Sequence, residues 1–195
     1  MKARFVASLL LCLACAGCAS LPPLPATCEK IGPAGAICPL PPSALPKVEA
    51  SHLVTVTHQG QSHTFLGRLE IDDKALRLAG ASLFGTHLFT ITWDGRTVAS
   101  QPPEPDMHPK LMVAMLEVAL ADPALLRPQL HGMTLTLERK DGVETRELVE
   151  HGHLVAHIER RGATLATARL SIRIPPADLS LQLKPLQAPA EGAQP

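Results

Sequence analysis

Apolar and polar side chains alternate with a period of two along most of the chain after His52. Such alternation is typical of antiparallel strands that bury one face and expose the other. The stretch "LVTVTHQGQSHTFLGRLEIDD" predicts two strands joined around residues 59–61. "KALRLAG" and "GTHLFTITWDGRTVAS" continue the pattern, and Asp94-Gly95 is a preferred two-residue hairpin turn. We therefore expect a first meander of about five strands.

The hydrophobic period changes to 3.6 in the middle of the chain. "QPPEPDMHPKLMVAMLEVALADP" predicts a helix over 109–121, because Pro109 suits a first helical turn. Asp122-Pro123 ends this helix and can start a short second one. The apolar stripe of the helix consists of Leu111, Met112, Met115, Leu116 and Ala119.

Strand patterns resume after the helices. "MTLTLERKDGVETRELV" predicts a hairpin turning at Asp141-Gly142, and "HLVAHIERRGATLATARLSIRIP" predicts another turning near Arg161-Gly162. "DLSLQLK" reads as a last strand. An antiparallel sheet of about ten strands twists and curls. The predicted fold is therefore mainly β, an unclosed antiparallel β-barrel with a helical lid inserted between two meanders.

A curved sheet that its lid fills imperfectly leaves an apolar cavity. Apolar residues on the inner face would line this cavity or simply pack as core, and simple packing is the commoner role of any one such residue. The candidate ligand-lining residues are Phe65, Leu69, Leu76, Leu78, Phe89, Ile91, Trp93, Met112, Met115, Leu116, Leu135, Leu137, Leu154, Ile158, Leu170 and Ile172.

The N-terminal residues have the pattern of an export signal. Lys2 and Arg4 precede an apolar run over 5–16 that is too short for a transmembrane helix. The run ends in "CAGCAS", which resembles a bacterial lipobox. This resemblance implies cleavage after residue 17 and acylation of Cys18, with palmitate or similar chains, and the following Ala-Ser favours the outer membrane. The alternative is an ordinary cleaved signal.

Residues 18–51 are rich in proline, alanine and glycine, which predicts a stiff, lipidated linker between the membrane and a domain over 52–184. Cys28 and Cys38 lie in this linker. In an oxidising compartment we expect them to form a disulfide, the alternative being two free thiols. Residues 185–195 read as a flexible tail.

Composition argues against nucleic-acid binding. Without Lys2 and Arg4 the chain keeps 16 of its 18 basic residues beside 18 acidic ones, a net charge of about −2. No basic patch stands out, tyrosine is absent and aromatic residues make up 3% of the chain. Nucleic-acid binding usually needs positive charge and stacking rings.

Candidate chemistry is sparse. His151, His153 and His157 fall on one polar strand face, but the outer two would lie about 20 Å apart on an extended strand. They are therefore expected to be solvated and to bind no metal. Ser82 lies in "GASLFG", which is not the nucleophile elbow G-x-S-x-G. Without a nucleophile–base pair, we expect neither enzymatic activity nor a cofactor.

The stretch "LRLAGASLFGTHLFTITWDGRTVAS" and the closing hairpin "HLVAHIERRGATLATARLSIRIP" carry a resemblance. They look like the LolA/LolB group of periplasmic lipoprotein carriers, and most closely like LolB-like proteobacterial lipoproteins, some encoded in aryl-polyene lipid clusters. The resemblance covers roughly 52–184 and implies an unclosed barrel with a greasy cavity for acyl chains. The residues that carry it include Ser82, Leu83, Gly85, Leu88, Phe89, Asp94 and Gly95.

These features together predict an outer-membrane lipoprotein on the periplasmic face. It would bind or transfer a hydrophobic ligand, which could be a lipid, an aryl-polyene-type lipid or the acyl chain of a lipoprotein. The alternative is a non-enzymatic structural or assembly lipoprotein with a filled core that contacts a periplasmic or outer-membrane protein.

Overall fold

The computed structural model describes residues 25–102 and 108–186. The predicted signal segment 1–17, the lipidation site Cys18 and nearly all of the predicted tail lie outside the described residues. In the described part of the chain, none of the helices has the length and apolar character needed to cross a bilayer.

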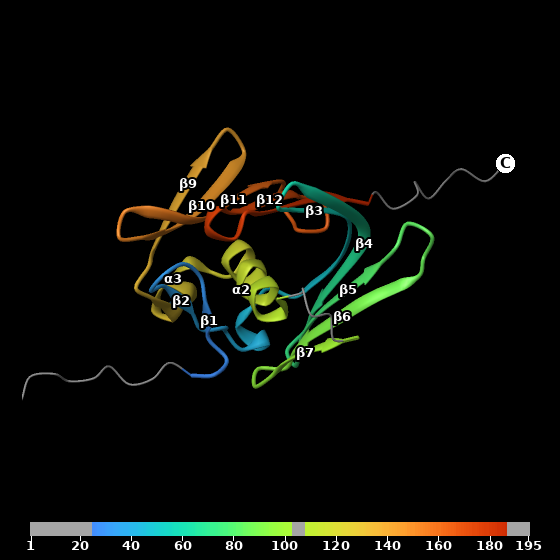
Figure 1. Cartoon of the computed structure of the whole chain (residues 1–195), viewed down its shortest axis with the longest axis horizontal. Helices are drawn as coiled ribbons and strands as arrows, with labels where there is room; N and C mark the ends of the chain where they lie inside the picture. The colour runs from blue at the N-terminus through green and yellow to red at the C-terminus, as the bar shows by residue number, and fades with distance from the viewer. Residues whose placement is uncertain (1–24, 103–107, 187–195) are drawn as a thin grey trace, which may run out of the picture.

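One antiparallel sheet of ten strands dominates the molecule (Figure 1). The first meander contains β3 (Val48–His58), β4 (Gln61–Ile71), β5 (Leu76–Ala81), β6 (His87–Trp93) and β7 (Val98–Gln101). The second contains β9 (Thr134–Lys140), β10 (Val143–Glu150), β11 (His153–Arg161), β12 (Arg169–Ile174) and β13 (Leu179–Pro185). Pairing of β3 with β13 joins the meanders, and the strand order runs from β7 to β9 without closing. The predicted unclosed antiparallel sheet is confirmed.

The helices lie between the two meanders, as the sequence predicted. Helix α2 spans Pro109–Leu120 and the short α3 spans Pro123–Leu126. Between them, Asp122 accepts a hydrogen bond from the backbone N–H of Ala124, which caps α3. Single 3-10 turns lie at η1 (Pro42–Ala44), η2 (Arg127–Gln129) and η3 (Pro175–Ala177).

Helix α2 lies inside the curve of the sheet, with β1 and β2 on its other side (Figure 1). The residues buried along it are Leu111, Val113, Ala114, Met115, Leu116, Glu117, Val118, Ala119 and Leu120. They cover almost the whole circumference, so α2 covers the concave face of the sheet as predicted and is in addition enclosed on its outer side.

The predicted Pro-rich linker is wrong over residues 25–51, because this segment is part of the fold. β1 (Glu29–Lys30), β2 (Ala36–Ile37) and β8 (Leu130–His131) form a small sheet. The larger apolar side chains that this segment adds to the core are those of Ile31, Ile37, Leu40 and Leu45. The Cys28–Cys38 disulfide is present as predicted, with an S–S distance of 2.00 Å.

Two boundaries and one strand face also differ from prediction. β3 begins at Val48, and β13 continues through Pro185, after which Leu186 donates a backbone hydrogen bond to Ser51. Leu154 is 40% exposed because β10 and β11 shift register by one residue there, which buries Val155 instead.

Candidate functional site

An apolar cavity of about 40 Å³ lies between α2 and the concave face of the sheet. The first half of α2 forms one wall, and strands β3, β4, β5, β12 and β13 form the other. Its lining consists of Val54, Phe65, Leu78, Leu111, Met112, Met115, Leu116, Ile172, Ile174, Leu179, Leu181 and Leu183. With only apolar side chains around it, the cavity offers a ligand no hydrogen-bonding side chain.

Only some of the residues predicted from the sequence to line a ligand cavity line this one. Those that line it are Phe65, Leu78, Met112, Met115, Leu116 and Ile172. Those that are buried core elsewhere are Leu69, Leu76, Phe89, Ile91, Trp93, Leu135, Ile158 and Leu170. Leu137 lines a different cleft and Leu154 faces solvent, so both were wrongly predicted as ligand-lining.

Six lining residues were missed by sequence reasoning. They are Val54, Leu111, Ile174, Leu179, Leu181 and Leu183. Strand β13 supplies half of them, because its pairing with β3 places Leu183 opposite Val54. The alternation in "DLSLQLK" was a sufficient signal that these leucines share a face.

The hollow is far smaller than an acyl chain requires. Pockets for small molecules usually measure about 300 to 1,000 Å³. The prediction of a large hollow is therefore wrong for this conformation, in which α2 and the sheet are packed closely together.

A surface groove of about 360 Å³ lies directly beside the cavity. Its walls are Lys30, Ile31, Gly32, Pro33, Leu111, Ile174, Pro176 and Ala177. Leu111 and Ile174 belong to both linings, so these two side chains separate the groove from the cavity.

The cavity wall contains side chains that can move. Met112 is half-buried and lies next to buried Met115, and methionine has three rotatable bonds with which to fill or vacate irregular space. Leu179 and Leu181 are also half-buried at the sheet side.

The β5–β6 turn displays apolar side chains to solvent. Phe84 is 98% exposed and Leu83 is 58% exposed. The Ser82 hydroxyl accepts hydrogen bonds from the backbone N–H groups of Phe84 and Thr86 at 3.3 and 3.1 Å. Ser82 therefore shapes the turn that presents Phe84.

Glu117 is a fully buried acid that sequence reasoning missed, although it is the one charged residue in "LMVAMLEVAL". Its Oε2 accepts the backbone N–H of Leu40 at 2.9 Å, and the Leu40 carbonyl accepts the indole N–H of Trp93 at 2.7 Å. Burial raises the pKa of Glu117 to about 8, against the smaller opposing effect of the Leu40 hydrogen bond. Glu117 thus joins α2 to the N-terminal segment as a largely neutral group.

The three C-terminal histidines do not form one cluster. His151 lies in the β10–β11 turn, whereas His157 contacts Glu147 at 3.0 Å and Glu159 at 3.2 Å. Within residues 25–102 and 108–186, no group of three His, Cys, Asp or Glu side chains is placed to hold a metal ion.

Comparison with known proteins agrees with the extent of the ten-stranded sheet. No curated protein matches the chain. A family model described as "Protein of unknown function (DUF3261)" matches residues 49–187, from the start of β3 to just past β13. The match leaves out most of the N-terminal segment that covers α2. Because it spans well over half of the sequence, the chain belongs to the DUF3261 family.

Proposed function

We propose that this protein binds a hydrophobic chain, from a lipid, an aryl-polyene-type lipid or a lipoprotein acyl group, in a widened form of the α2 cavity. The observation that carries the proposal is the wall of two side chains, Leu111 and Ile174, between the apolar cavity and the adjoining groove. If the cavity and the groove were joined, their combined volume would fall in the lower part of the range found for small-molecule pockets.

Burial of hydrocarbon would supply the affinity. Each buried CH₂ contributes about 0.8 kcal/mol, so a 12-carbon chain could gain roughly 10 kcal/mol before the entropic costs of binding. Lys30, at the groove, offers a cation for the carboxylate of a fatty acid. Binding of this kind requires no catalytic residue and no cofactor.

The proposed location is the periplasmic face of the outer membrane, with an acyl anchor on Cys18. The exposed Phe84 and Leu83 support contact with a membrane, since apolar side chains at an exposed tip gain free energy by entering the lipid interface. The proposed relation to LolA/LolB carriers is supported by the unclosed sheet with a helix in its concavity.

The Leu111→Ala variant tests this proposal. Shortening the dividing side chain should speed the uptake of a fluorescent fatty-acid probe by the delipidated full chain, because it opens the wall between groove and cavity. Leu120→Ala on the same helix is the control, since Leu120 is equally buried and lines neither space. Stopped-flow fluorescence measures the rates, and equal rates in both variants would contradict the proposed entry route.

A second candidate function is a structural or assembly lipoprotein with a filled core, which contacts a membrane protein. The small cavity and the enclosure of α2 favour it. Native mass spectrometry of protein purified from membranes separates the two candidates, because only the carrier should retain a co-purified lipid.

A further inference from the structure

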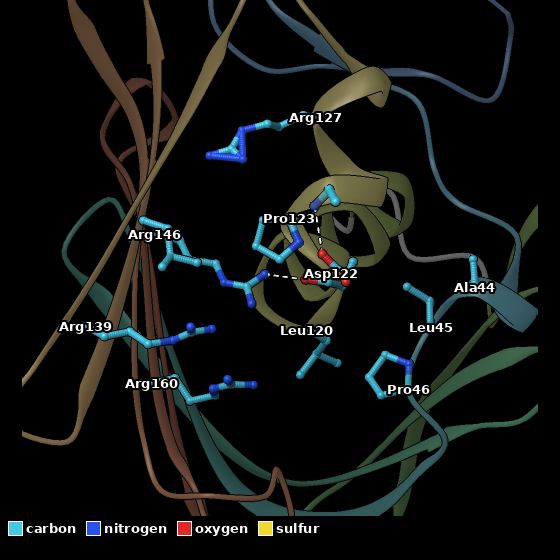
Figure 2. A pocket seen from close by; sticks show the side chains of 13 residues that line it. Ala44, Leu45, Pro46, Leu120, Asp122, Pro123, Arg127, Arg139, Arg146 and Arg160 are labelled. Carbon is cyan, nitrogen blue, oxygen red and sulfur yellow. Dashed lines mark hydrogen bonds between the residues drawn. The ribbon is translucent and has the colours of Figure 1, made fainter.

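An open cleft of about 890 Å³ lies at the C-terminal end of α2, away from the apolar cavity (Figure 2). The inner faces of β9, β10 and β11 form one wall, and the segment around η1 forms the opposite wall. The lining consists of Ala44, Leu45, Pro46, Leu120, Ala121, Asp122, Pro123, Ala124, Arg127, Leu137, Arg139, Arg146 and Arg160.

Positive charge is concentrated in this cleft although the whole chain has no net formal charge. Four arginines line it beside one carboxylate, that of Asp122, and a second carboxylate, that of Glu144, pairs with three of these arginines. Arginine keeps its charge at every physiological pH. The cleft therefore holds two uncompensated positive charges.

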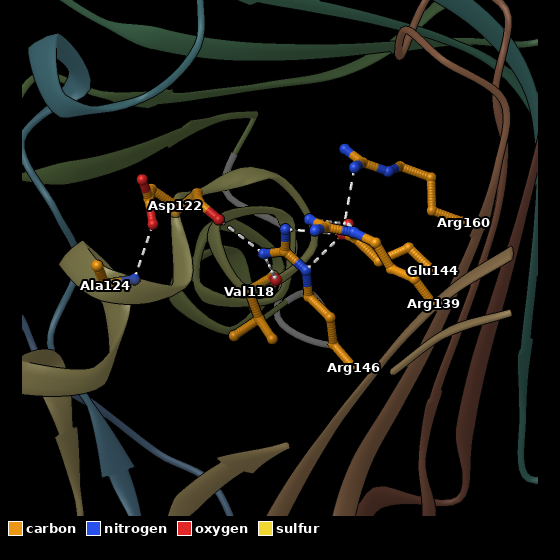
Figure 3. A network of polar contacts seen from close by, with 8 residues as sticks. Val118, Asp122, Ala124, Arg139, Glu144, Arg146 and Arg160 are labelled. Carbon is orange, nitrogen blue, oxygen red and sulfur yellow. Dashed lines mark hydrogen bonds and ion pairs between the residues drawn. The ribbon is translucent and has the colours of Figure 1, made fainter. Parts of the chain in front are cut away.

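Three of the arginines share one carboxylate. Arg139 and Arg160 flank Glu144 in register on the neighbouring strands, and Arg146 follows two residues along β10. Their guanidinium nitrogens lie 2.7, 3.2 and 2.8 Å from the Glu144 carboxylate (Figure 3). One negative charge cannot neutralise three positive ones, so the row still attracts anions.

Each guanidinium nitrogen of Arg146 already has a partner within the protein. Its Nη1 donates to the carbonyls of Val118 and Ala121 at 2.8 and 2.7 Å, which satisfies the C-terminal end of α2, while its other nitrogens contact Glu144. The Asp122 side chain turns toward Ala124 (Figure 3). Neither group is available to a ligand.

Arg127 and Arg160 keep most of their donors available. In the described part of the chain, Arg160 contacts only Glu144, and Arg127 donates only to the Leu135 carbonyl at 3.3 Å. A guanidinium has five N–H donors. Arg139 and Arg160 point side by side into the cleft, and Arg127 approaches from its other end (Figure 2).

We propose that this cleft binds a phosphoryl group through the unused donors of Arg127 and Arg160, with Arg139, whose Nε and Nη2 contact Glu144, adding positive charge. Paired guanidinium forks match the geometry and charge of a phosphoryl oxyanion, and Arg160, with a side chain 24% exposed, is partly shielded from water. Leu45, Pro46 and Leu120 supply an apolar wall for the organic part of the ligand. The site is separate from the proposed acyl-chain cavity and does not depend on it.

Pyrophosphate binding to the full chain, measured by isothermal titration calorimetry at constant ionic strength, tests the proposal. The wild type should bind saturably, and the double variant Arg127→Gln/Arg160→Gln should bind at least tenfold more weakly. Arg169→Gln/Arg173→Gln removes the same charge from exposed positions on β12 and should bind like the wild type. Circular dichroism checks that each variant is folded.

Absence of saturable binding by the wild type would overturn the proposal, and so would equal weakening in both double variants. Co-sedimentation with phosphatidylcholine vesicles, with and without phosphatidic acid, identifies the source of the phosphoryl group. Vesicle binding that needs phosphatidic acid and is competed by pyrophosphate supports a lipid headgroup. Pyrophosphate binding without vesicle preference supports a soluble phosphate.

Discussion

At the residue scale, Glu117 makes the clearest prediction about pH. Its folded-state pKa of about 8 lies above the ordinary value of 4.5, so the folded protein holds a proton that the unfolded chain releases. The free energy of unfolding should therefore fall as the pH rises from about 5 to 8. Glu117→Gln, which keeps an acceptor for the Leu40 N–H, should remove this dependence and stabilise the protein by about 2 to 5 kcal/mol at pH 9.

Urea unfolding at pH 5, 7 and 9 measures this effect. Glu138→Gln is the control, because Glu138 is exposed on β9 and should leave the pH dependence unchanged. A Glu117→Gln curve parallel to that of the wild type would show that burial does not hold the proton.

Glu144 has the opposite pH behaviour. Burial alone would raise its pKa, but hydrogen bonds from Arg139 and Arg146 outweigh burial and hold the pKa below the ordinary 4.5. Its contribution to stability is thus present above about pH 4.5 and is lost as the pH falls through the folded-state pKa.

Glu144→Gln should lower the free energy of unfolding at pH 7 by about 3 kcal/mol, because it leaves three guanidiniums without their carboxylate. Glu49→Gln breaks only the exposed pair with Arg68 and should cost less than about 1 kcal/mol. Thermal denaturation of both variants checks the difference, and equal losses would refute the role assigned to the arginine row.

At the element scale, the N-terminal segment is the main surprise. Proline-rich composition predicted a linker, yet residues 25–47 cover α2 through short strands, a disulfide and buried apolar side chains. Local composition could not reveal this, because the partners of the segment, such as β8 and Glu117, lie far away in the sequence.

The disulfide should stabilise the packing of residues 25–47 over α2. Cys28 and Cys38 lie ten positions apart and close a short loop, which the chain-entropy model values at about 2 to 3 kcal/mol. Cys28→Ser/Cys38→Ser should lower the free energy of unfolding by that amount in urea titrations. An unchanged midpoint would mean that the segment is held by packing alone.

Other elements were predictable to different degrees. Period-two alternation predicted every strand of the ten-stranded sheet, and the 3.6-residue period predicted α2 to within a residue of its end. The amphipathic interpretation of α2 missed the burial of its outer side, where Val113, Glu117 and Val118 are buried instead of exposed to water. The exposure of Leu154 depends on a β-bulge, for which the sequence offers no strong signal.

At the scale of the whole molecule, the two meanders were predictable, but the pairing of β3 with β13 that joins them and the size of the enclosed space were not. Alternation tells which side chains face inward, whereas cavity volume depends on how tightly α2 and the N-terminal segment pack against them. The same limit applied to the arginine cleft. Arg127, Arg139 and Arg160 are scattered in the sequence and meet only through strand register and the position of α3.

The most direct test of the proposed carrier function is equilibrium titration of the full chain with a fluorescent fatty-acid probe. The wild type should bind saturably, and Leu181→Phe, which fills the cavity from its half-buried rim, should bind at least tenfold more weakly. Leu130→Phe, at a half-buried leucine outside the cavity lining, should leave the affinity unchanged. Absence of saturable binding by the wild type, or equal affinities in the wild type and Leu181→Phe, would contradict an acyl-chain site between α2 and the sheet.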